Sequence, residues 1–135
     1  MKTDETARRR PVIHMIEAEA DKLTNLALAV EDKLPQVSEL LLREVTRAKV
    51  HAPDAMPADV VTMGAEVEFV DEGSGAARTV QLVYPPEADI AAGRISILTP
   101  IGAGLIGLKA GQSILWPDRD GRERALRIVR VTRTA

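Results

Sequence analysis

Apolar residues in the first third of the chain recur at the spacing of a helix. Between residues 16 and 34 they step by 4, 3, 4, 3 and 4 positions, which is typical of the seam of an amphipathic helix. These residues are Ile16, Ala20, Leu23, Ala27, Val30 and Leu34. Most charged residues of the stretch fall off this seam, so the pattern predicts a helix that buries one face.

A second helical stripe begins after a proline. Pro35 disfavours helical geometry in the residue before it and suits the first position of a new helix. The stripe that follows consists of Val37, Leu41, Val45 and Ala48. Two helices of about 15 residues with a tight turn predict a short antiparallel hairpin (coiled coil) that projects roughly 20–25 Å from one end of the molecule. Such a hairpin is marginal alone and needs a partner surface or the rest of the chain.

The hydrophobic period shifts towards two in the second part of the chain, after a proline-containing boundary at residues 52–64. Val67 and Phe69 alternate with acidic residues, residues 71–75 resemble a turn, and residues 77–84 supply a partner strand. This order predicts a β-hairpin.

A strand, a short helix and a second strand are expected in residues 94–116, which read RISILTPIGAGLIGLKAGQSILW. Thr99 can cap a helix that begins at Pro100, and Gly111 ends the unit. The helix presents an apolar side made of Ile101, Leu105, Ile106 and Leu108. The glycines between them are best explained by close helix packing.

The chain is expected to end in a strand at residues 124–132. Leu126 and Val131 point inward on it, together with either Ile128 or Val129. The predicted fold class is α+β, with a helical hairpin at residues 1–52 and a domain of about five antiparallel strands and one short helix at residues 53–135.

Composition removes several classes of function. The 135 residues carry a net charge of −2 and one residue each of Phe, Trp and Tyr, which argues against a surface for nucleic acid. There is no cysteine and no apolar run of the roughly 20 residues needed to span a bilayer. The charged N-terminus lacks an apolar segment behind it, so no signal peptide is expected and a cytoplasmic protein is predicted.

Catalytic chemistry finds little support in the sequence. His14 and His51 lie at opposite ends of the predicted hairpin without a ligand-spaced neighbour, and exposed positions at helix ends are the favoured interpretation. The four serines lack a histidine base, and the glycine-rich stretch lacks the Lys-Ser/Thr pair that completes a phosphate loop. No catalytic residue, metal or cofactor is therefore predicted.

Glu31 and Asp32 fall at the tip of the predicted hairpin. Two exposed carboxylates can hold a divalent ion through oxygen atoms and water. The alternative, a solvated polar tip, is favoured, because tips are usually polar and Lys33 offsets part of the charge.

Arginines gather near both ends of the chain. They are Arg8, Arg9 and Arg10, then Arg119, Arg122, Arg124, Arg127, Arg130 and Arg133. They either contact an acidic surface or a phosphate backbone, or form a solvated edge strand whose charges discourage pairing between molecules. The second interpretation is favoured.

Three segments resemble the C-terminal domain of Gre-type transcript cleavage factors. They read DVVTM at residues 59–63, LVYP at 82–85 and ISILTPIGAGLIGLKAGQ at 95–112. The length, the short hairpin and the junction before residue 64 resemble the family of regulators of nucleoside diphosphate kinase (Rnk) within that superfamily.

The resemblance implies an FKBP-like C-terminal fold and RNA polymerase as partner. In Gre-type factors this domain docks at the rim of the polymerase secondary channel through the loop that enters the short helix. Thr99, Pro100, Ile101 and Gly102 inherit that partner-binding role, with Pro100 and Ile101 expected as an exposed apolar anchor. An FKBP-like fold does not by itself imply prolyl isomerase activity.

The predicted hairpin is much shorter than that of a cleavage factor, so Glu31 and Asp32 should not reach the catalytic metal of the polymerase. The leading hypothesis is a non-enzymatic regulator of transcription that competes with Gre-type factors. A transcript-cleavage cofactor that uses the tip carboxylates is one alternative. The other is a hairpin that self-associates through its seam, although a monomer is favoured.

Overall fold

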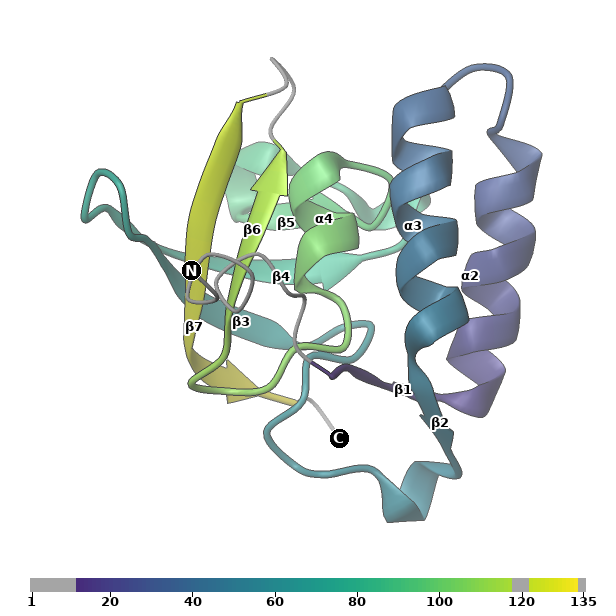
Figure 1. Cartoon of the computed structure of the whole chain (residues 1–135), viewed down its shortest axis with the longest axis horizontal. Helices are drawn as coiled ribbons and strands as arrows, with labels where there is room; N and C mark the ends of the chain where they lie inside the picture. Colours follow the sequence, from purple (N-terminus) through teal and green to yellow (C-terminus); the bar gives the residue numbers. More distant parts are fainter. Residues whose placement is uncertain (1–11, 118–121, 134–135) are drawn as a thin grey trace, which may run out of the picture.

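The computed structural model describes residues 12–117 and 122–133, which form a mixed α+β fold (Figure 1). In chain order the helical elements are α2 (Glu17–Ala29), α3 (Pro35–Arg47), η1 (Pro53–Ala55), η2 (Pro85–Glu87), η3 (Ile90–Ala92) and α4 (Pro100–Leu105). The strands are β1 (His14–Ile16), β2 (Lys49–His51), β3 (Glu66–Asp71), β4 (Ala77–Val83), β5 (Arg94–Ser96), β6 (Ser113–Pro117) and β7 (Glu123–Thr132). Within these residues, no helix is long and apolar enough to cross a bilayer.

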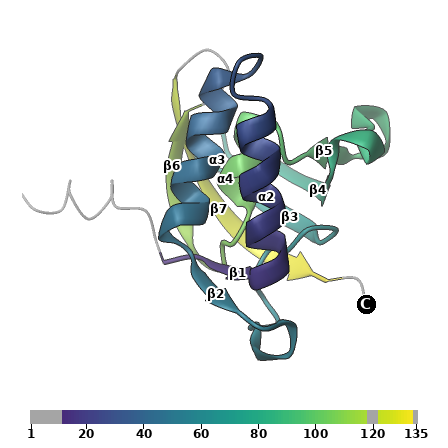
Figure 2. The same ribbon diagram turned by 90° about the vertical axis from the view of Figure 1, so that its right-hand side faces the viewer.

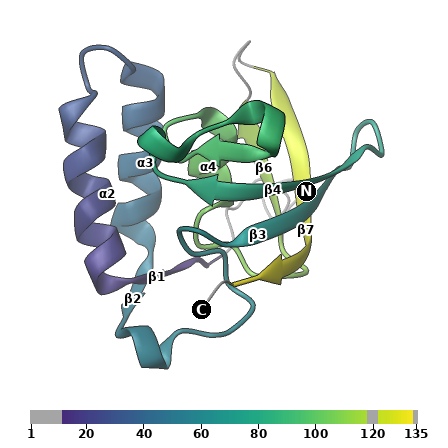
Figure 3. The same ribbon diagram turned by 180° about the vertical axis from the view of Figure 1, so that it is seen from behind.

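Five strands form one sheet in the order β5-β4-β3-β7-β6. Its pairs are antiparallel except β4 with β5, which run parallel, so the expectation of a wholly antiparallel sheet is wrong at that edge. The β3–β4 turn points away from the helical hairpin (Figure 3). We call this sheet together with α4 the head.

The predicted helical hairpin is present, although each helix has 13 residues. Pro35 occupies the first turn of α3, as the sequence predicts. Helix α2 buries Ala20, Leu23 and Ala27 along one face. The Ser38 hydroxyl donates a hydrogen bond of 2.8 Å to the Ala27 carbonyl and so ties the two helices together.

The hairpin does not project from the head, which corrects the expectation of a free arm. It lies along the head, with α3 beside α4 (Figures 1 and 2). Leu23 and Leu41 belong to the same buried cluster as Phe69 and Trp116 of the head. The physical reason lies in α3, where Leu40 and Leu41 are both buried and widen the apolar face beyond a narrow seam.

Two short strands close the base of the hairpin, and the sequence pattern did not reveal them. β1 and β2 pair in parallel, with Met15 opposite Val50. Ile16, which the pattern assigns to the helix, lies in β1. The backbone N–H of His14 donates to the Gly107 carbonyl (3.1 Å), so β1 also joins the hairpin to the head.

A register shift in the β3–β7 pairing decides which residues of the last strand face inward. The shift lies between Glu68 and Phe69, whose partners are Arg130 and Ile128. The skipped residue, Val129, is 39% exposed, whereas Ile128 is fully buried. The extra residue in β7 changes the alternation of faces.

Candidate functional site

The loop that enters α4 is held by hydrogen bonds between near neighbours. The Thr99 hydroxyl accepts a hydrogen bond from the Gly102 N–H (3.0 Å) and donates one to the Ser96 carbonyl (2.8 Å). Pro100 follows at the first helical position, where no N–H donor is needed. The predicted cap is therefore confirmed, and the loop has little conformational freedom.

Two glycines let α4 pack tightly against its surroundings. A Cβ atom on Gly102 would lie 2.3 Å from the Ser96 carbonyl oxygen, and one on Gly104 would lie 2.8 Å from the Trp116 ring. The Trp116 indole N–H donates to the Pro100 carbonyl. The backbone of α4 is thus fixed to both β5 and β6.

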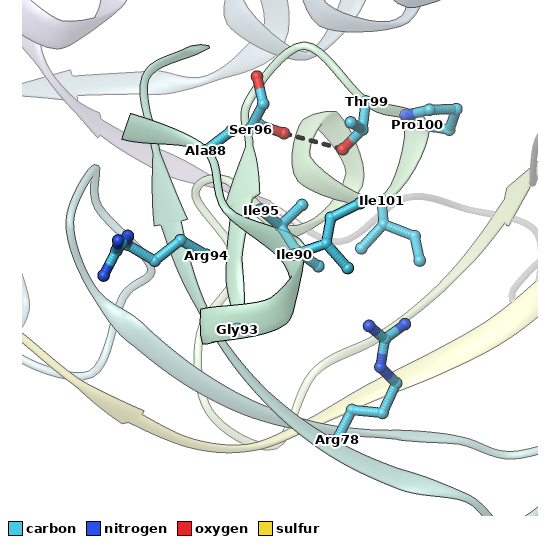
Figure 4. Close-up of a pocket in the computed structure, with 10 residues that line it drawn as sticks. All are labelled: Arg78, Ala88, Ile90, Gly93, Arg94, Ile95, Ser96, Thr99, Pro100 and Ile101. Atoms are coloured by element: carbon cyan, nitrogen blue, oxygen red, sulfur yellow. Dashed lines mark hydrogen bonds between the residues drawn. The ribbon is translucent and has the colours of Figure 1, made fainter. Parts of the chain in front are cut away.

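An apolar pocket opens beside this loop, with a volume of about 400 Å³ (Figure 4). We call it the isoleucine pocket, after the three isoleucines that meet in it. It is lined by Arg78, Ala88, Ile90, Gly93, Arg94, Ile95, Ser96, Thr99, Pro100 and Ile101. Three of the four residues expected to bind a partner therefore contribute to one concave site.

Only part of the apolar anchor expected from the sequence is exposed in the pocket. Pro100 is buried, so its expected role as an exposed anchor is wrong. Gly102 is also buried and acts through close packing. Ile101 is half-buried, and Ile90 is 79% exposed. These two isoleucines come from segments on either side of β5.

Arg78 supplies positive charge at the mouth of the pocket. Its guanidinium points towards Ile101 (Figure 4) and lies 6.0 Å from the Phe69 ring centre. Arg78 and Ile101 also line an adjoining hollow of about 330 Å³ next to Phe69. Arg94 instead donates to the Glu87 carbonyl (3.1 Å) and pairs with Asp89 (3.6 Å), which stabilises the neighbouring loop.

The carboxylates of the hairpin tip lie where the sequence places them. Glu31 and Asp32 are exposed in the turn between α2 and α3. In the part of the chain that the structure describes, no three or more His, Cys, Asp or Glu side chains are grouped so that they could hold a metal ion. The tip therefore has two carboxylate side chains, Glu31 and Asp32, and no third metal-binding side chain is grouped with them in the described part of the chain.

The arginines of β7 form ion pairs along the sheet surface. Arg124 lies 2.7 Å from Asp71, Arg127 lies 3.3 Å from Glu72, and Arg130 lies 3.3 Å from Glu68; these are distances between the nearest nitrogen and oxygen atoms. The hydrogen bond from Arg124 holds the pKa of the Asp71 carboxyl below its ordinary value.

β7 lies between β3 and β6, so the interpretation of these arginines as belonging to an edge strand is wrong. Their carboxylate partners come from β3 and the turn after it. Arg8, Arg9, Arg10 and Arg119 lie outside the described residues.

The structure brings together the two histidines that the sequence analysis kept apart. His14 Nδ1 lies 2.9 Å from His51 Nε2, at the base of the hairpin. Burial lowers the pKa of His14, and the neighbouring His51, Lys49 and Lys109 lower it further. The two residues are 37 positions apart, and only the β1–β2 pairing reveals their proximity.

A second polar contact joins α2 to the head. The Glu19 carboxylate accepts a hydrogen bond of 3.2 Å from the Met63 N–H, and burial raises the pKa of this carboxyl. The Lys22 ammonium lies 4.4 Å from the centre of the Tyr84 ring. Both contacts hold the hairpin in one orientation against the head.

The comparisons with known proteins agree with this architecture. Residues 56–133 match the family model described as transcription elongation factor GreA/GreB, C-terminal. The chain is 34% identical over 107 residues to the regulator of nucleoside diphosphate kinase of Escherichia coli K12, covering 79% of each chain. It is 36% identical over 102 residues to transcription elongation factor GreA of Acidiphilium cryptum, covering 76% of this chain and 62% of that one.

A solved structure, the transcription elongation factor GreA/GreB of Nitrosomonas europaea, aligns with a TM-score of 0.71 at 36% identity. The alignment covers 91% of this chain and 99% of that one. Together these matches show that the chain belongs to the Gre-type superfamily of transcription elongation factors, which includes the regulators of nucleoside diphosphate kinase.

Proposed function

We propose that this protein is a non-enzymatic regulator of transcription that binds RNA polymerase through the isoleucine pocket. It occupies the rim of the secondary channel and competes there with longer Gre-type factors, and this partner places it in the bacterial cytoplasm. The family supports the proposal, because relatives of this chain are named as transcription elongation factors. A relative of this chain is named as a regulator of nucleoside diphosphate kinase, and the proposal includes an influence on that kinase, either direct or through transcription.

The observation that carries the proposal is the rigid apolar site at the entry to α4. Ile101 is held at its place by the Thr99 cap on one side and by the packing of Gly102 on the other. A preorganised apolar side chain in a concave site binds a partner at a low cost in conformational entropy. Arg78 beside it favours a partner surface that carries carboxylates.

The dimensions of the hairpin support regulation without transcript cleavage. Each helix of 13 residues is about 20 Å long at a rise of about 1.5 Å per residue. The hairpin also packs along the head, so the tip gains little reach beyond it. Glu31 and Asp32 therefore stay far from the polymerase active centre when the head is docked at the rim.

The FKBP-like character expected for the head also belongs to this proposal. The five-stranded sheet and α4 are consistent with it. The residues that line the isoleucine pocket include no aromatic side chain, although prolyl isomerases use such side chains to bind proline. We infer that the head keeps this architecture for docking and does not isomerise proline.

The test of docking is the retention of core RNA polymerase on the immobilised full-length chain. Ile101→Asp places a charge in the pocket mouth and should abolish retention. Leu28→Asp is the matched control, because Leu28 is 50% exposed on α2, outside the pocket, and should retain polymerase normally. Equal retention by the Ile101→Asp and native chains would contradict the proposed docking site.

Competition and cleavage are tested on a backtracked elongation complex. The native chain should leave the RNA unshortened and should inhibit cleavage stimulated by a longer Gre-type factor. Shortening of the RNA that disappears in Glu31→Ala would instead support the cleavage cofactor.

Self-association through the hairpin seam is disfavoured by the structure. Leu23 and Leu41 are fully buried within the molecule and are not available to a second copy. Sedimentation over a range of protein concentrations should show a monomer, and a dimer lost on mutation of the hairpin would contradict this expectation.

A further inference from the structure

One wall of the isoleucine pocket is formed by a residue that the docking loop does not contain. Ile90, on η3, is 79% exposed, more than any other large apolar side chain in the described part of the chain. Its side chain lies beside that of Ile101 in the pocket (Figure 4). An isoleucine this exposed loses contact with water when a partner covers it, so its burial favours binding.

The segment that carries Ile90 is held in one conformation. The Asp89 N–H donates to the Arg94 carbonyl (2.9 Å), and the Arg94 N–H donates back to the Asp89 carbonyl (2.9 Å). The Arg94 side chain donates to the Glu87 carbonyl (3.1 Å) and lies 3.6 Å from the Asp89 carboxylate. Ile90 is therefore presented by a fixed loop, which lowers the entropy lost when a partner binds.

The charges at the pocket are unbalanced, and Arg78 is the reason. Two arginines line the pocket and no carboxylate does. Arg94 is paired with Asp89, whereas Arg78 is exposed and forms no ion pair within the described residues. The carboxylate that lines the adjoining hollow, Asp71, already lies 2.7 Å from Arg124. Arg78 is thus the positive charge that the pocket offers to a partner.

We propose that the isoleucine pocket recognises a two-part element on RNA polymerase. An apolar side chain inserts between Ile90 and Ile101, and a neighbouring carboxylate pairs with Arg78. This inference rests on the docking function proposed above and names the chemistry that the site selects. The apolar part supplies affinity through burial, and the charge supplies rate and selectivity. A polymerase surface with a positive charge in place of that carboxylate should bind poorly.

The experiment measures the affinity of the full-length chain for purified core RNA polymerase, free of nucleic acid, at about 0.1 M and about 1 M salt. Arg78→Ala should weaken binding about fivefold at the lower concentration and hardly at all at the higher one, because salt screens an exposed charge pair. Arg78→Lys keeps the charge and should bind almost as the native chain does. Ile90→Ser should weaken binding about tenfold at both concentrations, since apolar burial is not screened.

Two control variants make the same kinds of change outside the pocket. Arg43 is exposed on α3, where it lies 3.4 Å from Glu39, and Arg43→Ala removes one positive charge. Leu28→Ser removes an apolar side chain that is 50% exposed on α2. Both variants should bind polymerase as the native chain does. Because Ile90 and Arg78 are exposed, their variants should keep the fold, which thermal melts verify.

The outcomes separate this inference from docking itself. Suppose that the native chain binds and Ile101→Asp does not, but Arg78→Ala or Ile90→Ser binds like the native chain at the lower salt concentration. The docking site then stands, and the two-part element is overturned. An Arg78 effect that appears only after nucleic acid is added assigns the arginine to a phosphate backbone and also overturns it. If the native chain does not bind polymerase, the docking function and this inference fail together.

A charge swap identifies the carboxylate. Arg78→Glu brings like charges together and should weaken binding to native polymerase more than Arg78→Ala does. Replacement of a single carboxylate at the rim of the secondary channel by lysine should restore the binding of Arg78→Glu. If no single replacement restores it, Arg78 does not pair with a polymerase carboxylate, and the inference is overturned.

Discussion

The entry to α4 and the base of the hairpin each bring polar groups together over an apolar layer, but they are assembled differently. At α4, Thr99 and Gly102 are three positions apart and form their hydrogen bond within one turn. At the base, His14 and His51 meet only because β1 and β2 pair across 37 positions. Local chemistry therefore builds the first contact, whereas the second depends on the pairing of the two ends of the hairpin.

The largest expected effect tests whether the hairpin and the head are one cooperative unit. Leu41 is fully buried in the cluster that they share, so Leu41→Ala should lower the free energy of unfolding by about 3 kcal/mol. Hydrogen exchange should show protection falling together in α3 and β3.

The control for this variant is Leu34→Ala, since Leu34 is 40% exposed at the hairpin turn. It should change the free energy of unfolding by less than about 0.5 kcal/mol. Loss of protection in α3 alone after Leu41→Ala would mean that the hairpin unfolds independently of the head. The two would then not be one cooperative unit.

The next effect concerns the tight packing of the α4 entry. Gly102→Ala places a Cβ atom 2.3 Å from a backbone oxygen that cannot move aside, and it should destabilise the fold by about 2 kcal/mol. Urea denaturation measures this loss. At Gly73 the added Cβ would meet only the end of the Asp71 side chain at 3.3 Å, so Gly73→Ala should be nearly neutral. Equal effects of the two variants would argue against a rigid loop.

Removal of the Thr99 cap should have a smaller effect. Thr99→Ala loses the hydrogen bond to the Gly102 N–H and should lower the free energy of unfolding by about 1 kcal/mol. Thr46→Ala serves as the comparison, because the Thr46 hydroxyl only bonds back to Leu42 on an exposed part of α3. If the two substitutions destabilise the protein equally in thermal melts, Thr99 has no special role as a cap.

The smallest effect is the pH dependence that Glu19 contributes. A raised pKa means that the folded state holds the proton more tightly than the unfolded state, so this contribution to stability is complete below pH 4.5 and is lost as the pH rises through the folded pKa. A glutamine side chain at this position would keep an acceptor for the Met63 N–H without titrating. The stability of Glu19→Gln relative to the native chain should therefore increase from pH 4 to pH 7, as measured by urea denaturation. A constant difference would contradict the buried-carboxylate interpretation.

The sequence predicts those parts of the fold that depend on neighbouring residues. The helix break at Pro35 and the cap at Thr99 both follow from local backbone chemistry, and the structure confirms them. The alternation of Val67 and Phe69 likewise indicates the buried face of β3. The division of the chain at residue 52 stays a prediction, because one buried cluster spans both parts.

What the sequence did not reveal depends on contacts between distant segments. β1 and β2 have three residues each, too few for a periodic pattern to appear. Pro100 is buried where its carbonyl accepts a hydrogen bond from Trp116, which lies 16 positions later. The sequence pattern did not identify Ile90 and Arg78 as pocket residues, because one is an isolated isoleucine in a loop and the other an arginine on a strand. They line one pocket only once β4, β5 and the segment that contains Ile90 are folded together.

Trp116 is the only tryptophan of the chain, and its ring touches the backbone of the helix that follows the proposed docking loop. Its indole N–H donates to the carbonyl of Pro100, the residue immediately before Ile101. The protein thus carries a natural fluorophore that contacts the residue next to the proposed point of contact. Changes in its emission can follow partner binding in real time without any attached dye.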